Sequence, residues 1–316
     1  MAESKIPLTA VVGPTASGKT SLAVELCQRL NGEAVSCDSM QIYKGMDIAT
    51  AKPSEKEMQG VPHHLIGFLD PEIPFSVAKY CEMAKSAIND IVARGKRAVL
   101  VGGTGLYYSS LVDNIEFLPD ETDFEYREEL KKKAVMNGAQ CLLDELYGID
   151  PEAASRLHVN NVGRIIRALE IYHTTGKTIT QQNELSKQNP TSFETVTICL
   201  DARDRQFLYD RINRRVDAML DEGLLDEAKS FLSSHAGSTA KQAIGYKELA
   251  PYFEGNASLD ECIENLKMQT RRYAKRQLTW FRRCENINYI YIDDYGSFEE
   301  IADTAIKIIK EGEQRG

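Results

Sequence analysis

The sequence predicts an α/β fold, in which a parallel sheet flanked by helices carries an all-helical insertion. Short β-prone runs alternate with helical periods toward both ends of the 316-residue chain, an order typical of βαβ units. Residues 119–191 show helical periods and no strand candidate. Residues 13–20 form a glycine-rich loop between a strand and a helix. These observations predict a P-loop NTPase-like core of residues 1–118 and 192–316, with residues 119–191 inserted into it.

The glycine-rich loop reads GPTASGKT and fits the phosphate-binding pattern G-x-x-x-x-G-K-[ST] at every fixed position. A β-prone run over residues 8–12 precedes it, and leucines at helical spacing follow it over residues 22–30. Backbone N–H groups at such a helix N-terminus form a cradle for anions. We expect Lys19 to reach the outer phosphates of a di- or triphosphate and the Thr20 hydroxyl to hold Mg²⁺. The predicted diphosphate-binding residues of this loop are Gly13, Pro14, Thr15, Ala16, Ser17, Gly18, Lys19 and Thr20.

The composition is that of an ordinary globular protein, with 42% hydrophobic and 27% charged residues. No apolar run approaches the roughly 18 residues of a membrane span, and the N-terminus lacks a signal-peptide core, so a cytoplasmic protein without membrane contact is expected. Seven cysteines without a C-x-x-C pair and five histidines predict neither a disulfide framework nor a histidine metal site. The net charge of −9 argues against a general nucleic-acid coat but leaves local basic patches open.

A second strand is expected over residues 33–37, and Asp38 follows directly. Ligands of open α/β sheets bind at the carboxyl ends of the strands, so the Asp38 carboxylate is expected beside the phosphate-binding loop. The residues alone leave three roles open for it, namely an outer ligand of Mg²⁺, a general base or a turn-forming aspartate. Residues 40–53 follow neither a strand nor a helix period, which predicts a long functional loop over the sheet edge.

A helix is expected over residues 76–94 and a buried strand over residues 98–101. Gly-Gly-Thr-Gly follows at residues 102–105, where an ATPase motor usually carries an acidic residue for Mg²⁺. Glycines let a bulky group approach the backbone closely, and Thr104 can donate a hydrogen bond into that gap. A tight turn without a ligand role fits the pattern about equally well.

Two pairs of arginines are candidate anion contacts. Arg164 and Arg167 share a face of the helix that starts at residue 161, although such surface arginines are more often solvated than bound. After a strand over residues 195–200, Arg211 and Arg215 lie four apart on one helix face. Beside a phosphate-binding loop, a pair of this kind is suited to clamp a polyphosphate.

The last basic feature is residues 271–283, which carry six positive charges, no acid and three aromatic residues. Arg272, Arg276 and Arg283 are predicted to fall on one side of a helix, an arrangement that suits phosphate tracking on a nucleic acid. A solvated helix face is the alternative. The final expected elements are a strand over residues 288–292 and a helix over residues 298–310.

The chain resembles the tRNA dimethylallyltransferase (tRNA isopentenyltransferase) family, in its bacterial form, over most of its length. The motifs that carry this resemblance are GPTASGKT at 13–20, Asp38-Ser39, IYKGMDI at 42–48, TAKP at 50–53, PHHL at 62–65, GGTGLY at 102–107, RALE at 167–170, AIGYKE at 243–248 and AKRQLTW at 274–280. Ala49 departs from the glycine that the family often has there. The zinc-binding Cys/His pattern of the eukaryotic members does not follow the core.

The resemblance implies that a dimethylallyl group passes from dimethylallyl diphosphate to N6 of the adenosine on the 3′ side of a tRNA anticodon, with Mg²⁺ as cofactor and diphosphate as product. N6 is a weak nucleophile because its lone pair is delocalised into the ring, and Asp38 matches the family's general base. Arg215, with Arg211, is implied to neutralise the departing diphosphate. Thr104 matches the mouth of the channel through which a flipped-out base enters.

The resemblance also implies that the helical insertion clamps the anticodon arm of tRNA, and a monomer is the simplest expectation for a clamp around one tRNA. The positions that match tRNA contacts, together with the basic residues of 271–283, are Asp38, Ser39, Met40, Gln41, Thr104, Arg127, Gly163, Arg164, Ile165, Ile166, Arg167, Arg272, Arg276 and Arg283.

Three other functions compete with this one. An adenylate isopentenyltransferase would perform the same chemistry on a free nucleotide, but a small acceptor needs neither the insertion nor the basic residues of 271–283. A P-loop small-molecule kinase is disfavoured because no acidic residue follows Val101. A non-catalytic RNA-binding switch would have no need of Asp38.

Overall fold

The computed structural model describes residues 5–115, 117, 123–187, 190–237 and 239–314. The chain divides into two compact units, one of Met1–Val112 with Ser192–Gly316 and one of Asp113–Thr191. The boundary expected between residues 118 and 119 falls outside the described residues. Within the described ranges, every helix is too short or too polar to cross a bilayer.

The larger unit is built on a six-stranded sheet with the order β3-β2-β4-β1-β5-β6. Every pairing between neighbouring strands is parallel, which confirms the predicted sheet. The strands are β1 (Ile6–Val12), β2 (Gly32–Ser36), β3 (His63–His64), β4 (Arg97–Gly102), β5 (Phe193–Asp201) and β6 (Ile287–Tyr291). Because β1 lies between β4 and β5, the loops after β1, β2 and β4 meet at the same carboxyl edge.

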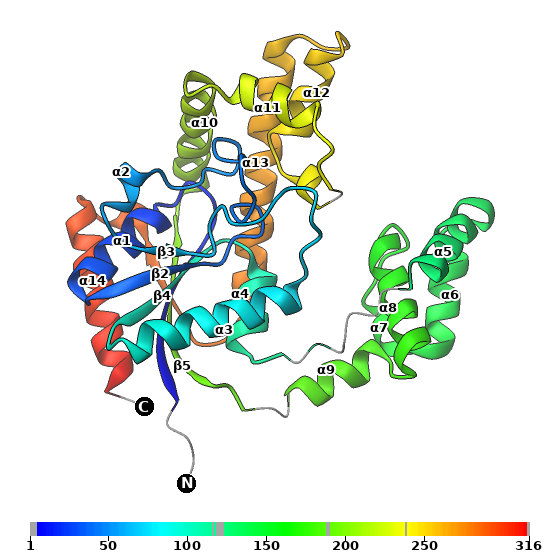
Figure 1. Ribbon diagram of the computed structural model, residues 1–316, viewed down its shortest axis with the longest axis horizontal. Helices are drawn as coiled ribbons and strands as arrows, with labels where there is room; N and C mark the ends of the chain where they lie inside the picture. Colours follow the sequence, from blue (N-terminus) through cyan, green and yellow to red (C-terminus); the bar gives the residue numbers. More distant parts are fainter. Residues whose placement is uncertain (1–4, 116, 118–122, 188–189, 238, 315–316) are drawn as a thin grey trace. The chain divides into compact units, whose positions relative to one another are not determined.

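Helices cover both faces of this sheet, as expected for a parallel sheet (Figure 1). They are α1 (Lys19–Arg29) and α14 (Phe298–Glu313) on one face and α3 (Val77–Ala93) and α4 (Gly105–Val112) on the other. The core between β1 and α1 is apolar because Leu22 and Leu26 recur at helical spacing and are fully buried. Asn31 ends the α1 segment with a positive φ of 51°, a conformation that asparagine tolerates.

A second group of helices in the larger unit extends beyond the carboxyl ends of the strands (Figure 1). Its members are α10 (Arg205–Asp221), α11 (Leu224–Leu232), α12 (Tyr246–Phe253) and α13 (Leu259–Phe281). They share a hydrophobic cluster with residues 40–53, which form an irregular loop as predicted and are called the wall loop below. The short elements α2 (Glu55–Met58), η1 (Ala240–Gln242) and η2 (Ile292–Asp294) complete this unit.

The smaller unit is helical throughout its described residues and has its own core. Its helices are α5 (Phe124–Asn137), α6 (Gln140–Ile149), α7 (Pro151–Ser155), α8 (Val162–Thr175) and α9 (Ile179–Lys187). Leu130, Leu142, Leu146 and Leu169 are buried in one cluster. The Asp150 carboxylate caps α7 and also accepts hydrogen bonds from Thr180, which joins α7 to α9.

Candidate active site

The phosphate loop, residues 13–20, turns sharply between β1 and α1. Gly13, Ala16 and Gly18 have positive φ values of 136°, 63° and 95°. A side chain at position 13 would bring its Cβ to 2.4 Å from the carbonyl oxygen of Leu200, so glycine is required there. These left-handed residues give the loop its tight turn immediately before the N-terminus of α1, the kind of helix end at which anions bind.

Two side chains from distant helices hold this loop. Arg211 of α10 donates its Nε hydrogen to the carbonyl oxygen of Ala16 at 2.8 Å. Gln277 of α13 accepts the Thr15 N–H at 2.9 Å and donates to the carbonyl oxygen of Gly103 at 3.0 Å. Gln277 is buried and ties the phosphate loop to the turn after β4. Its role was not predicted from the sequence, because glutamine in the AKRQLTW motif carries no local signal of such a contact.

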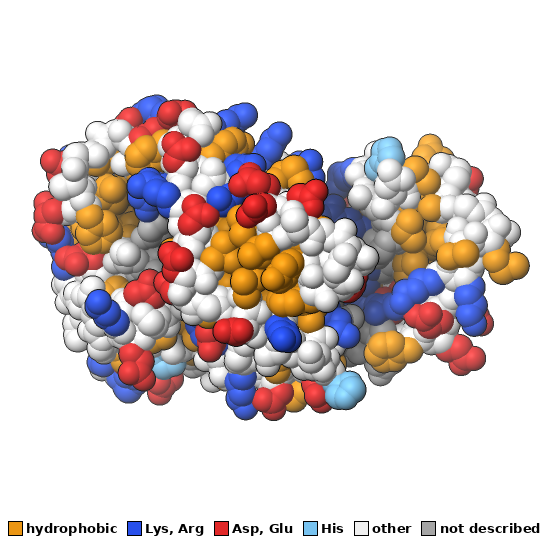
Figure 2. Space-filling model, turned by 90° about the horizontal axis from the view of Figure 1, so that it is seen from above, with side chains coloured by type: hydrophobic (Ala, Val, Ile, Leu, Met, Phe, Trp, Pro, Cys, Tyr) orange, Lys and Arg blue, Asp and Glu red, His pale blue; other side chains and the backbone are white. Residues whose placement is uncertain are grey.

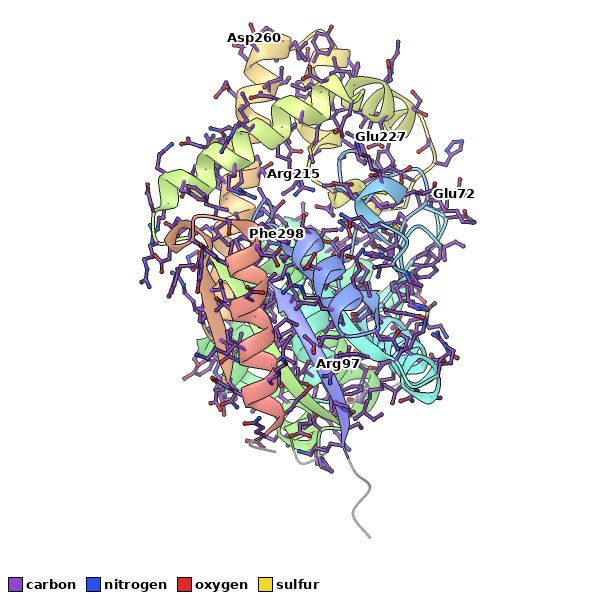
Figure 3. The ribbon with its side chains drawn as sticks, turned by 90° about the vertical axis from the view of Figure 1, so that its left-hand side faces the viewer. Glu72, Arg97, Arg215, Glu227, Asp260 and Phe298 are labelled. Carbon is purple, nitrogen blue, oxygen red and sulfur yellow. The ribbon has the colours of Figure 1, made fainter. Side chains whose placement is uncertain are left out.

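A cavity of about 390 Å³, called the inner cavity, lies at the carboxyl edge of the sheet. Lys19, Thr20, Asp38 and Arg215 border it, together with apolar residues of the wall loop, α10 and α13. Figure 3 shows Arg215 between α10 and the end of the sheet. The structure thus brings together the phosphate loop, the carboxylate after β2 and one arginine of the predicted pair.

A second, wider cavity of about 1260 Å³ lies on another side of the phosphate loop. Lys19, Thr20 and Arg215 border this outer cavity as well, and Arg211 and Arg214 add further positive charge. Both cavities belong to the larger unit. The phosphate loop therefore borders both cavities, which share Lys19, Thr20 and Arg215.

Burial outweighs the nearby carboxylates at two cationic groups of the site. Burial, and after it the nearby Arg215, together lower the pKa of Lys19 to about 8, although Asp38 acts in the opposite direction. Burial also lowers the pKa of Arg215, with Glu57 and Asp38 acting in the opposite direction. Two cations that repel each other in a desolvated site favour binding of an anion between them.

Asp38 has a turn-forming role and also borders the inner cavity. Its Oδ1 accepts the N–H groups of Met40 at 2.9 Å and Gln41 at 3.3 Å. The Thr104 hydroxyl accepts the Ser39 N–H at 3.0 Å and donates to the Ser39 hydroxyl at 3.2 Å. Asp38 can therefore form the turn and also act at the cavity. One carboxylate oxygen accepts the hydrogen bonds of the turn, and this turn holds the residue at the cavity wall.

The glycines after β4 accommodate the protein's own residues. A Cβ on Gly102 would lie 2.2 Å from the carbonyl oxygen of Cys37, and one on Gly105 would lie 2.3 Å from Cδ1 of Trp280. The bulky groups that approach this backbone are therefore the end of β2 and the indole of α13. Trp280 also donates its Nε1 hydrogen to Ser109 at 3.0 Å.

In the smaller unit, two of the arginines predicted to contact tRNA share an internal partner. Arg127 of α5 and Arg167 of α8 both lie against the buried Glu170, with Nη–Oε2 distances of 2.6 and 2.9 Å. This ion pair joins α5 to α8. Both arginines remain partly exposed, at 31% and 44% of their side-chain surface.

The start of α8 presents a mixed surface. Gly163 and Arg164 are exposed, as a contact with a partner requires. Ile165 and Ile166 are buried in the core of this unit, so their side chains do not face a partner. The helical period turns these two positions inward, so a contact of Ile165 or Ile166 with tRNA would have to use the backbone, and it stays a prediction.

Two of the three arginines in the predicted basic row, Arg272 and Arg276, lie on α13. Helix α13 ends at Phe281, so Arg283 follows the helix by two residues, and its N–H donates to the carbonyl oxygen of Trp280 at 3.0 Å. Arg276 borders the inner cavity, with its guanidinium 5.7 Å from the centre of the Tyr273 ring. On the face of the larger unit shown in Figure 2, acidic and basic side chains are interspersed.

No group of three or more His, Cys, Asp or Glu residues that could hold a metal ion occurs in the described part of the chain. His63 and His64 diverge, as predicted for adjacent strand residues. His63 Nδ1 contacts the carbonyl oxygen of Val61, and His64 Nε2 lies 2.7 Å from Glu33.

Comparison with known proteins gives consistent results. The model of the IPP transferase family matches residues 41–284. The tRNA dimethylallyltransferase of Thermoanaerobacter sp. (strain X514) is 47% identical over 308 residues, covering 96% of this chain and 98% of the relative. That of Halalkalibacterium halodurans is 49% identical over 291 residues, covering 92% of each chain.

Solved structures are similar over nearly the whole chain. The full-length tRNA isopentenylpyrophosphate transferase of Bacillus halodurans has a TM-score of 0.72 and 45% identity, covering 98% of this chain and 99% of its own. A eukaryotic dimethylallyltransferase described as acting on tRNA has a TM-score of 0.78 and 28% identity, covering 94% of this chain and 77% of its own.

Proposed function

This chain belongs to the IPP transferase family. On that basis we propose which molecule donates the dimethylallyl group and which atom of tRNA accepts it. The enzyme transfers a dimethylallyl group to tRNA, as its relatives are named for doing. We propose that the group comes from dimethylallyl diphosphate and goes to N6 of the adenosine on the 3′ side of the anticodon. One observation carries this proposal: Lys19 and Arg215, which suit the leaving diphosphate, border the same cavity as the Asp38 carboxylate.

The phosphate loop and its cations act on the leaving group. When the bond between the allylic carbon and the diphosphate oxygen breaks, the electron pair stays on that oxygen. Lys19 and Arg215 offset the charge that develops there, and Arg211 supports the loop from α10. The lowered pKa values of Lys19 and Arg215 support this role, because a bound diphosphate would stabilise the charged forms that burial disfavours.

The residues present fit a Mg²⁺ ion held mainly by the substrate. Thr20 lies in the first turn of α1 and borders both cavities, so we assign its hydroxyl as the protein ligand of the ion. Mg²⁺ commonly binds through one or two protein groups, substrate phosphates and water. When bound, the ion would neutralise part of the diphosphate charge.

Asp38 is proposed to take the proton of the attacking amine. As N6 forms its bond to the allylic carbon, one N6 proton passes to the Asp38 carboxylate. The hydrogen bonds from Met40 and Gln41 hold Oδ1 at the carboxyl edge of β2. The base is therefore fixed in position before the substrate binds.

Acceptor recognition is assigned to both units. Residues 119–191 are proposed to contact the anticodon arm through Arg164, Arg127 and Arg167, with Gly163 allowing close approach of the backbone. In the larger unit, Asp38, Ser39, Met40, Gln41 and Arg276 border the inner cavity and are the remaining proposed contacts, together with Thr104, which is hydrogen-bonded to Ser39, and Arg272 of α13. A monomer acting in the cytoplasm is the simplest form, since one chain carries all of these residues and tRNA is the acceptor.

A prenyl-transfer assay with dimethylallyl diphosphate and Mg²⁺ tests the proposal, with unmodified tRNA and AMP offered in parallel. Digestion and mass spectrometry are expected to show a dimethylallyl gain on one adenosine of the anticodon loop and none on AMP. A gain on AMP alone would refute the tRNA acceptor. A gain on tRNA outside the adenosine next to the anticodon would refute the proposed position.

A further inference from the structure

A single carboxylate organises the wall loop. Glu227 of α11 accepts three consecutive backbone N–H groups, those of Asp47 and Ile48 on Oε2 at 2.9 and 2.8 Å and that of Ala49 on Oε1 at 2.9 Å. Figure 3 shows Glu227 at the side of α11 that faces this loop. Three N–H groups that converge on one anion form a nest, a strong and directional backbone contact.

A fourth donor fixes the carboxylate itself. The Tyr246 hydroxyl of α12 donates to Glu227 Oε1 at 2.9 Å, and the Tyr246 ring is fully buried. Gly245, with a φ of 122°, packs against Ala49, whose Cβ would lie 2.9 Å from a Cβ added to the glycine. Glu227 thus contacts both the AIGYKE motif, through Tyr246, and the IYKGMDI motif of the wall loop, through Asp47 and Ile48. Neither motif has an assigned role in the reaction itself.

Glu227 acts on the site through the loop, since it borders neither cavity itself. Ala49, Thr50 and Ala51 form part of the inner cavity wall. The carbonyl oxygen of Ala51 accepts from Gln41 Nε2 at 3.0 Å and from Arg215 Nη2 at 3.5 Å. Movement of this segment would therefore displace Arg215.

We propose that Glu227 is a positioning residue that holds residues 47–51 in place and so places Arg215 for the departing diphosphate. The inference rests on the proposed role of Arg215. Glu227 itself has no proposed contact with the reacting atoms.

The test replaces the carboxylate with an amide of the same shape. Glu227→Gln keeps one acceptor oxygen and turns an NH₂ group toward N–H or O–H donors, so part of the nest is lost. We expect kcat with tRNA and dimethylallyl diphosphate to fall by about ten- to a hundredfold, the range for a small misplacement of catalytic groups. We also expect faster amide hydrogen exchange in the peptide covering residues 44–52, with KM for tRNA near that of the wild type.

The matched control is Asp226→Asn, which removes the same charge from the first turn of the same helix at an exposed position. It should leave both kcat and exchange unchanged. Tyr246→Phe keeps the buried ring and removes one donor to Glu227, so it should give a smaller change of the same kind and serves if Glu227→Gln does not fold.

Two results would overturn the inference. Unchanged exchange of residues 44–52 in Glu227→Gln would show that the carboxylate does not hold the loop. Faster exchange with kcat within about twofold of the wild type would show that the loop does not place Arg215. Failure of the proposed reaction can be distinguished from failure of this inference. If the proposed reaction were wrong, the wild-type enzyme itself would not prenylate tRNA, but the hydrogen-exchange result for residues 44–52 would be unaffected.

Discussion

Replacing Lys19 with methionine should make the free protein more stable while abolishing its use of diphosphate. The pKa of this lysine is about 8 in the folded protein instead of the ordinary 10.5. Since one pKa unit corresponds to about 1.36 kcal/mol, holding the ammonium charged at neutral pH costs about 3 kcal/mol. The variant also loses the hydrogen bond from Nζ to the carbonyl oxygen of Pro14, which is worth about 1 kcal/mol. We expect a net gain of about 2 kcal/mol in the free energy of unfolding at pH 7, or roughly 4 °C in Tm.

The gain should depend on pH in a defined direction. The folded-state pKa of Lys19 lies below the unfolded value, so the unfolded wild type binds more protons between about pH 8 and 10.5. Wild-type stability therefore rises across this window relative to the variant. The advantage of Lys19→Met should be complete below pH 8 and should disappear as the pH approaches 10.5.

The assay combines thermal unfolding from pH 7 to 10 with calorimetric titration of inorganic pyrophosphate and Mg²⁺. Lys229→Met, at an exposed position of α11, is the control for loss of one positive charge. A variant that is no more stable than the wild type at pH 7, or whose advantage does not shrink at high pH, would refute the burial argument. Retained pyrophosphate binding would refute the proposed role of Lys19 in the cradle.

Three further predictions concern other parts of the molecule. Asp38→Asn keeps an oxygen for the turn, so turnover in the prenyl-transfer assay should fall by about 10²–10⁴ with tRNA affinity retained, and near-normal turnover would remove Asp38 as the base. Gln277→Leu leaves a buried N–H and a carbonyl oxygen unpaired, and urea unfolding should show a loss of about 2 kcal/mol, whereas unchanged stability would contradict the bridging role. Arg164→Ala should reduce the salt dependence of tRNA binding by about one charge without loss of Tm. Arg127→Ala should lower Tm because it removes a partner of buried Glu170, and the opposite pattern for these two arginines would contradict the surface described.

Local patterns in the sequence determined the elements of the core and the phosphate loop. Strand, loop and helix follow one another within residues 6–29, and each is encoded by neighbouring residues: the β-prone run, the glycines with positive φ, and leucines at helical spacing. The helical insertion was predictable for the same reason, because helices depend on contacts between residues three and four apart. The position of Asp38 at a strand end followed from the general geometry of parallel sheets.

Tertiary structure alone decided how the site is held together. Gln277 contacts the phosphate loop across 262 residues of sequence, and Glu227 contacts the wall loop across 178 to 180. Helix α13 ends at Phe281, two residues before the last arginine of the predicted basic row. Contacts of this kind depend on which faces of distant helices are buried against each other. The residues next to a side chain in the sequence therefore do not predict which distant residue it will contact.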